Sequence, residues 1–491
     1  MKSLLLALSV LLAFTQQAQT QNVFSKELIS ISGKIEHYQP NSKNGFISFR
    51  STDLKGRSTD TAVLIDQDGS FAVRIYQPYA ADIAFQYNEE FITLFASPGD
   101  HLKIYIDATQ FGSNNTRAQS IRVEGEKIPI SKWIIEYFEA KNKWTPTFTA
   151  DWENKELSDT VFAEQRKKQL ADEESFLESF NAERHPPKAF YQWAKNSILY
   201  NAGREISFHC FAGKTNYRLH DTALMELLKD FPLNGPQAIH CTDYYSFISI
   251  LSGDLEIIVN IHPSYQERKR LNGKNAFPLY LELYDKYSNG LARELMYYNL
   301  FVSTAPSLSE PYLPVFQQNV LNEIVKNEMA VKRAKLIQPF QPVDIIAKIK
   351  SQKADTLSKQ RILTLLEKLK GKNVFIDFWG SWCATCMIEM KHYPALMDSV
   401  KDLPVQFVFL AAETKDEKVA EVKAKFPSSA HFLNLSDNET RLLANVFRFN
   451  SYPAHFMLDA EGKTVDLRLG GIANANGLSK FAIDRIRAKG R

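Results

Sequence analysis

Two cysteines near the end of the chain, Cys383 and Cys386, lie between a short apolar run and a helical segment, and this pair constrains the fold most. The run at 373–379, "NVFIDFW", has the composition of a buried strand, and the segment at 383–400 has helical periodicity. Cys383 would then stand at the helix N-terminus, where unpaired amide groups favour a thiolate, with Cys386 one turn inside. This placement predicts that Cys383 is the exposed, attacking sulfur and that Cys386 resolves the mixed disulfide.

A metal site and a structural disulfide are the other interpretations of this pair. A zinc ribbon needs a second C-x-x-C, and the remaining cysteines of the chain are Cys210 and Cys241. Each of them follows a histidine, but adjacent residues on a helix point about 100° apart and are poorly placed to chelate one ion. We therefore expect no metal, and either a disulfide between Cys210 and Cys241 or two buried thiols.

The last part of the chain, 343–491, alternates between strand and helix patterns. Its order, β-α-β-α-β-β-α, is that of the thioredoxin fold, an α/β architecture. Strands are expected at 373–379, 405–412, 454–459 and 464–471, the last two as a hairpin, and helices at 383–400, 417–426, 439–449 and 477–490.

The stretch "FIDFWGSWCATCMIEM", at 375–390, resembles the motif of the extracytoplasmic thiol-disulfide oxidoreductases of the TlpA/ResA type. The resemblance implies that Trp382 precedes the nucleophile, that Asp377 is a buried acid and that Glu389 is the glutamate near the cysteines. Burial would raise the pKa values of both acids and let them exchange protons with the thiols. The alternatives are a hydrogen-bonded core aspartate and a solvent-facing glutamate.

A later stretch, 449–463, resembles the segment of the same family in which a cis-proline faces the dithiol. Tyr452-Pro453 is therefore the expected cis bond, and the expected substrate-binding residues are Trp382, Tyr452 and Pro453. A cis X-Pro bond brings backbone next to the active sulfur, where an extended substrate can pair with it. Because Pro394 comes later after the second cysteine than the proline of thioredoxins, the helix kink is expected to be shifted or absent.

The chain is too long for one core, since 491 residues predict two to four domains. Short alternating runs over 21–126 predict an all-β sandwich. Helical periodicity interrupted by prolines, as at Pro186-Pro187, predicts an α-helical domain over 127–342, and the thioredoxin-like domain follows at 343–491. The expected fold class is thus multidomain, and the first two regions loosely resemble the N-terminal extensions of such domains in Bacteroidetes.

The first twenty residues have the features of a secretory signal peptide. A positively charged second residue precedes an apolar stretch at 4–14, and Ala18 and Thr20 suit a cleavage site after residue 20. The apolar stretch is shorter than the roughly 20 residues of a membrane span, so we expect no stable membrane insertion after cleavage. The net charge of +3 gives no reason to expect nucleic acid as a partner.

The resemblance implies an exported thiol-disulfide oxidoreductase in the periplasm or cell envelope of a Gram-negative bacterium. It would reduce disulfides of other exported proteins through Cys383 and Cys386, without a cofactor, and would be recharged by a membrane-bound electron donor. The residues between the cysteines, Ala384-Thr385, leave the redox potential open. The alternative is an envelope binding or scaffold protein with a redox-sensitive thioredoxin-like domain; a peroxidase would need a Pro-x-x-x-Thr-x-x-Cys context, which the pair lacks.

Overall fold

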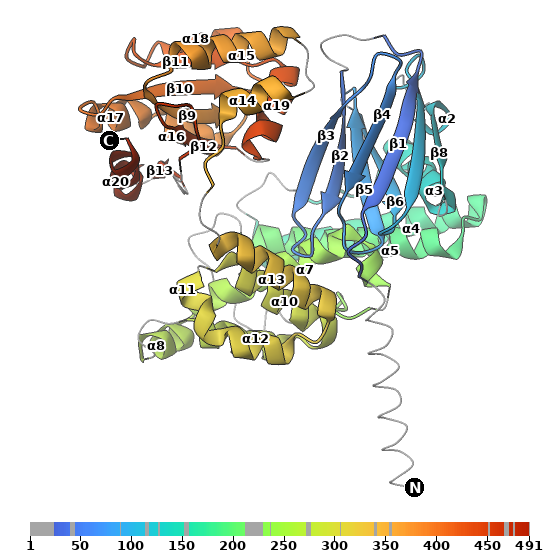
Figure 1. Ribbon diagram of the computed structural model, residues 1–491. Helices are drawn as coiled ribbons and strands as arrows, with labels where there is room; N and C mark the ends of the chain where they lie inside the picture. The colour runs from blue at the N-terminus through green and yellow to red at the C-terminus, as the bar shows by residue number, and fades with distance from the viewer. Residues whose placement is uncertain are drawn as a thin grey trace. The chain divides into compact units, whose positions relative to one another are not determined.

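The computed structural model groups the chain into two compact units (Figure 1). The first contains the described residues of 1–38, 48–60 and 66–338, and the second those of 39–47, 61–65 and 339–491. The expected signal peptide lies outside the described residues. Within the described residues, no helix has the length and apolar character needed to cross a membrane. The described residues are 24–39, 45–88, 90–112, 117–125, 128–151, 157–211, 229–235, 237–271, 276–304, 306–337, 341–352, 356–449, 452–465, 471–474 and 477–490.

The N-terminal part of the chain forms two four-stranded sheets, with strand orders β4-β1-β7-β8 and β3-β2-β5-β6. Their residues alternate in burial as the period of a strand requires, most regularly in β5. Phe49 of one sheet contacts Phe71 of the other, with ring centroids 5.9 Å apart. This sheet region is compatible with the expected β-sandwich. The strands are β1 (Ile29–Glu36), β2 (Phe46–Thr52), β3 (Ser58–Leu64), β4 (Ser70–Ile75), β5 (Ala81–Tyr87), β6 (Glu90–Ala96), β7 (His101–Asp107) and β8 (Ile121–Glu124).

Helices dominate the chain from α3 to α13, and α4, α5 and α7 run across one end of the two sheets (Figure 1). The pair Pro186-Pro187 separates α4 from α5, as the sequence predicts. The helices are α2 (Arg117–Ser120), α3 (Ile128–Lys143), α4 (Asp159–Arg184), α5 (Lys188–Phe211), α7 (Thr242–Ile261), α8 (Pro263–Leu271), α9 (Phe277–Tyr287), α10 (Gly290–Ser303), α11 (Pro306–Ser309), α12 (Leu313–Asn319) and α13 (Glu323–Ile337), with 3-10 turns η1 (Ala238–His240) and η2 (Glu310–Tyr312).

The sheets and helices of the first unit share one core. Tyr79, just before β5, stacks on Tyr245 of α7 with ring centroids 3.8 Å apart. Asp82 of β5 accepts hydrogen bonds of 3.0 Å from the Trp193 indole of α5 and from the Thr242 amide at the start of α7. The boundary that we expect between the β-rich and helical parts therefore falls inside this unit.

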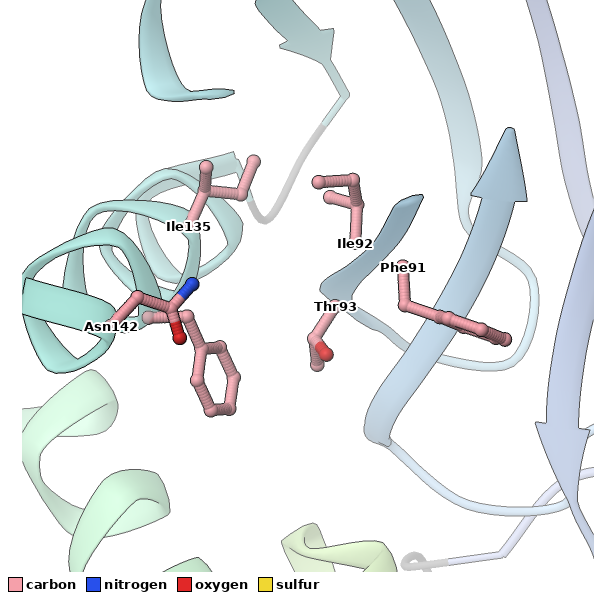
Figure 2. Close-up of a pocket in the computed structure, with 6 residues that line it drawn as sticks. Phe91, Ile92, Thr93, Ile135 and Asn142 are labelled. Carbon is pink, nitrogen blue, oxygen red and sulfur yellow. The ribbon is translucent and has the colours of Figure 1, made fainter. Parts of the chain in front are cut away.

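A hollow lies between β6 and α3 of the first unit (Figure 2). It is lined by the β6 residues 91–93 and, from α3, by Ile135, Phe138 and Asn142. These side chains are apolar or neutral, and none of them can act as an acid, a base or a thiol. The hollow therefore offers no chemistry of its own.

The second unit is built on a mixed sheet of order β11-β10-β9-β12. β9, β10 and β11 are parallel, and β12 pairs antiparallel with β9. Its elements are α14 (Ile345–Ser351), α15 (Thr356–Lys368), β9 (Asn373–Trp379), α16 (Ala384–Met390), α17 (Tyr393–Ser399), β10 (Val405–Ala411), α18 (Asp416–Lys423), β11 (His431–Asn434), α19 (Asp437–Phe447), β12 (Ala454–Leu458), β13 (Ala473–Asn474), β14 (Gly477–Leu478) and α20 (Lys480–Lys489).

Helices cover both faces of this sheet, which explains why β9 is buried along its length after Asn373 and is apolar except for Asp377. Val374, Ile376 and Phe378 pack with α14, α15 and α19 on one face. Phe375 and Trp379 pack with α16, α17, α18 and α20 on the other. Asp377, between them in a strand of period two, lies on this second face, against the helix that carries the cysteines.

Several details differ from the expected elements. β11 at the sheet edge, and α14 and α15 ahead of β9, were not expected. The expected helix at 383–400 is two helices, because α16 ends at Met390 and Pro394 stands in the first turn of α17. The expected kink is thus present as a break between α16 and α17, at a later position than in thioredoxins. Of the expected strand at 464–471, Thr464 and Val465 pair with β12, whereas 466–470 lie outside the described residues.

Candidate active site

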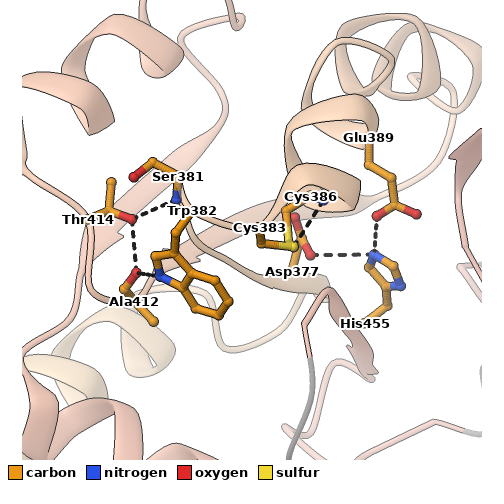
Figure 3. Close-up of a disulfide and its surroundings, with 9 residues drawn as sticks. All are labelled: Asp377, Ser381, Trp382, Cys383, Cys386, Glu389, Ala412, Thr414 and His455. Atoms are coloured by element: carbon orange, nitrogen blue, oxygen red, sulfur yellow. Dashed lines mark hydrogen bonds and ion pairs between the residues drawn. A yellow bond between two sulfur atoms is a disulfide. The ribbon is translucent and has the colours of Figure 1, made fainter. Parts of the chain in front are cut away.

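Cys383 and Cys386 are joined by a disulfide at the start of α16 (Figure 3). Cys383 is the N-cap of this helix, and its Sγ accepts a hydrogen bond of 3.1 Å from the Cys386 amide. Cys383 is 8% exposed and Cys386 is 1% exposed. The order of exposure agrees with the sequence prediction, but Cys383 is far less open than the prediction of an exposed sulfur requires.

Trp382 precedes the disulfide and is 54% exposed. Its indole nitrogen donates a 3.3 Å hydrogen bond to the Ala412 carbonyl, and Thr414 accepts a 3.0 Å bond from the Ser381 amide. A Cβ at Gly380 would lie 2.6 Å from the Trp382 indole nitrogen, so this turn needs a glycine. The loop before the cysteines is therefore tied to the loop after β10 while the indole stays accessible.

Tyr452 and Pro453 come just before β12, and the peptide bond between them is cis, as the resemblance implies. The Tyr452 ring meets the Trp382 ring edge to face, with centroids 5.2 Å apart. The structure thus brings together two of the three expected substrate-binding side chains. Burial, followed by the charge of Glu413, raises the pKa of Tyr452 to about 12.

Asp377 is 1% exposed, in the middle of β9. Among the described residues, neither of its oxygens receives a hydrogen bond of regular geometry, although His455 Nε2 lies 3.4 Å from Oδ1. Burial raises the pKa of Asp377 to about 7; the charge of His455 opposes this shift and that of Glu389 adds to it. The Tyr393 hydroxyl also interacts with Asp377 and, like the charge of His455, lowers its pKa, so Asp377 has neighbouring polar groups but no hydrogen bond of regular geometry among the described residues.

Glu389 is also 1% exposed, one turn after Cys386 on α16. Its Oε1 accepts a 2.9 Å hydrogen bond from the Ile472 amide, and its Oε2 accepts one of 3.0 Å from His455 Nε2. A Cβ at Gly471 would lie 2.9 Å from Oε1, so glycine lets this backbone approach the carboxylate. The solvent-facing alternative for Glu389 is thus wrong.

His455 is the site residue that the sequence reasoning missed. It lies on β12 directly opposite Asp377 of β9, and its side chain is 2% exposed. Figure 3 shows its imidazole between Asp377 and Glu389. Burial alone would lower the pKa of His455, but the Glu389 hydrogen bond and the charges of Asp377 and Glu389 together raise it. The available signal was its position two residues after Pro453, in a strand expected beside the first strand of the domain.

Residues 347–477 match the Redoxin family model. The chain is also 30% identical over 109 residues to the thiol-disulfide oxidoreductase ResA of Bacillus cereus. The C-terminal region is a TlpA/ResA-like thioredoxin-family domain. This redoxin domain is 29% identical over 106 residues to ResA of Bacillus subtilis. The matches cover 21% of this chain, and 59% and 57% of the two relatives.

The solved structures similar to the redoxin domain include the thioredoxin domain of a thiol-disulfide oxidoreductase from Bacteroides vulgatus. That likeness has a TM-score of 0.22 and 19% identity, and covers 26% of this chain and 84% of the other. Another is StoA from Bacillus subtilis, with a TM-score of 0.18 and 20% identity over 21% of this chain and 76% of the other.

The other cysteines lie in the first unit. Cys241 is a buried free thiol at the N-cap of α7, so the structure does not contain the expected Cys210–Cys241 disulfide. The side chain of Cys210 lies outside the described residues. In the described part of the chain, no group of three or more His, Cys, Asp or Glu residues could hold a metal ion.

Proposed function

We propose that this protein is an exported thiol-disulfide oxidoreductase that reduces disulfides in other exported proteins. The observation that supports it most is the Cys383–Cys386 disulfide at the start of α16, with the Cys383 sulfur accepting an amide hydrogen. After reduction, the same hydrogen bond would stabilise Cys383 as a thiolate. The redoxin domain and its similarity to ResA support the same chemistry.

In the proposed reaction, the Cys383 thiolate attacks one sulfur of a substrate disulfide. The substrate S–S bond breaks, a mixed disulfide with Cys383 forms, and one substrate thiolate leaves. Cys386 then gives its proton to Asp377 and attacks Cys383, which closes the Cys383–Cys386 disulfide and releases the second substrate thiolate. The substrate gains two electrons, the protein dithiol loses two, and a membrane-bound electron donor restores the dithiol.

Trp382, Tyr452 and Pro453 are the proposed substrate-binding residues. The exposed indole of Trp382 lies next to the nucleophile in sequence and packs against Tyr452, so it can cover an extended substrate chain. The backbone at Pro453 is the proposed pairing edge for that chain. These residues would recognise the polypeptide around a disulfide rather than one particular side chain.

Export is part of the proposal and rests on the features of residues 1–20. A Gram-negative cell would then hold the mature protein in its periplasm or envelope. N-terminal sequencing of the protein from an envelope fraction should find Gln21 first. A chain that keeps Met1 and stays in the cytosolic fraction would contradict the proposal.

Insulin reduction with dithiothreitol as the electron source tests the proposed activity. The wild-type chain should accelerate the reaction, and Cys383→Ser should fall to the uncatalysed rate. Cys241→Ala is the matched control, because it removes a buried thiol of the first unit. Equal rates for the wild type and Cys383→Ser would instead favour a binding or scaffold protein.

A further inference from the structure

A buried histidine joins the two acids of the site. The Nε2 atom of His455 lies 3.0 Å from Glu389 Oε2 and 3.4 Å from Asp377 Oδ1, so one nitrogen serves both carboxylates. The three residues come from β12, α16 and β9, and each side chain is almost completely buried. Two buried carboxyl groups that share one partner atom repel each other when both are charged.

The group of three is coupled to the cysteines through α16. Glu389 and Cys386 lie one turn apart on that helix and are buried to the same degree. Asp377 lies on the sheet face that α16 covers, beside Phe375 and Trp379 of the same packed layer as Cys386. A change in the charge of these three residues therefore changes the electrostatic potential at the Cys386 thiol, which must lose its proton.

We propose that His455 is a positioning residue for the exchange reaction, whose imidazolium bridges Asp377 and Glu389 and keeps Asp377 ionised as the proton acceptor for Cys386. The inference rests on the proposed function and adds a residue to it. His455 itself need not touch a substrate or a sulfur. It acts through the two carboxylates.

The surroundings of His455 supply few other charges. Asp377 from β9 and Glu389 from α16 are the charged groups that shift its pKa, and the neighbouring Phe375 ring is apolar. Tyr393 of α17 is fully buried beside the two acids, and burial raises its pKa well above the ordinary value, so it stays neutral. Removing the imidazolium would leave Asp377 with the charge of Glu389 and the neutral Tyr393 hydroxyl as neighbours, and would raise the pKa of Asp377 further.

The test uses the reduced mature chain and the chromogenic disulfide 5,5′-dithiobis(2-nitrobenzoate). Attack by Cys383 releases one coloured thiolate, and resolution by Cys386 releases the second, so stopped-flow absorbance separates the two steps. In His455→Gln the pH midpoint of the second phase should rise by about one unit, which slows that phase about 5-fold at pH 7, where Asp377 is about half ionised in the wild type. The first phase should change much less.

His431→Gln is the matched control, because His431 lies on the edge strand β11, two strands away from β9. Both of its phases should follow the wild type. A second phase in His455→Gln with the wild-type pH profile would overturn the inference and leave the proposed function standing. No second phase in the wild type itself would overturn the proposed function, and the inference with it.

A second measurement needs no substitution, in case His455→Gln does not fold. In the wild-type chain labelled with 13C-histidine, one imidazole should titrate at a higher pH than an ordinary histidine, and its NMR titration midpoint should differ between the disulfide and dithiol forms. Histidines that all titrate near the ordinary value of about 6.5, with the same midpoints in both forms, would overturn the inference.

Discussion

Two cysteines of this chain stand at helix N-caps, Cys241 before α7 and Cys383 before α16, and their surroundings differ. Cys241 is fully buried; burial first, and then the charges of Asp243 and Asp82, raise its pKa well above the ordinary value. Cys383 keeps some exposure and bonds to Cys386 one turn away. A helix N-terminus therefore does not by itself make a reactive thiol; access and a second cysteine are needed as well.

The largest expected effect comes from replacing the aspartate near each of these two cysteines and comparing the rates of the resolving step. Asp377→Asn removes the proposed proton acceptor of Cys386 and should slow the resolving step about 100-fold at pH 7. Asp243→Asn removes a carboxylate beside Cys241 and should leave that step unchanged. Stopped-flow assays of both variants measure this, and an equal loss in both would show that the two sites are not functionally distinct.

The stability of the redoxin domain should depend on pH through two buried groups, Asp377 and His455. The pKa of Asp377 is about 7 in the fold and about 4 in an unfolded chain, so burying its charge costs stability progressively as the pH rises from about 4 to about 7. The raised pKa of His455 stabilises the fold below about pH 6.5, and this contribution is lost as the pH rises through the folded value.

Asp377→Asn should therefore stabilise the domain by about 2 kcal/mol at pH 8 and by little at pH 4. We expect less than the full three-unit shift implies, because an asparagine amide is also costly to bury. Calorimetric unfolding at the two pH values checks this. Destabilisation at pH 8 would mean that the contacts of the carboxylate with His455 and Tyr393 outweigh the cost of burying its charge.

A smaller effect is expected from the exposed ring beside the nucleophile. Trp382→Ala should lower kcat/KM about 10-fold with a protein disulfide such as insulin, because a large aromatic contact surface is lost. Its effect on a small disulfide should be weaker. Phe481→Ala, which removes an exposed ring from α20, is the control and should not change either rate. Equal losses with both substrates would place Trp382 in the chemistry rather than in substrate binding.

The smallest effect is expected from the cysteines of the first unit. Replacing Cys210 and Cys241 with Ser should leave insulin reduction within about 2-fold of the wild type, while the buried hydroxyl at 241 lowers the melting temperature. Activity and thermal unfolding measured on one preparation check both parts. Loss of exchange with an intact fold would indicate a thiol relay between the units.

Much of the redoxin domain follows from local sequence. The apolar run of β9 requires burial on both faces, and the helical periodicity that begins at 383 places Cys383 at the start of α16. The edge strand β11 has four half-buried residues, too short a pattern to separate from a loop. The break after Met390 depends on where Pro394 can enter a new helix, which the cysteine motif does not specify.

The arrangement of Asp377, Glu389 and His455 could not be predicted from the sequence, because it depends on contacts between distant parts of the chain. His455 meets Asp377 only because β12 pairs antiparallel with β9 in that register, and one residue of slippage would turn it to the other face. Glu389 is buried because the backbone at Gly471 and Ile472, more than 80 positions away, closes over it. The motif indicated the two acids, but not the histidine between them.

The most direct test of the account compares Cys386→Ser with Cys383→Ser after incubation with oxidised insulin. Cys386→Ser keeps the attacking sulfur and loses the resolving one, so it should accumulate a covalent complex with insulin that dithiothreitol releases. Cys383→Ser should accumulate almost none. Equal trapping by both variants would contradict the assignment of the two cysteines, and trapping by neither would contradict the proposed oxidoreductase activity.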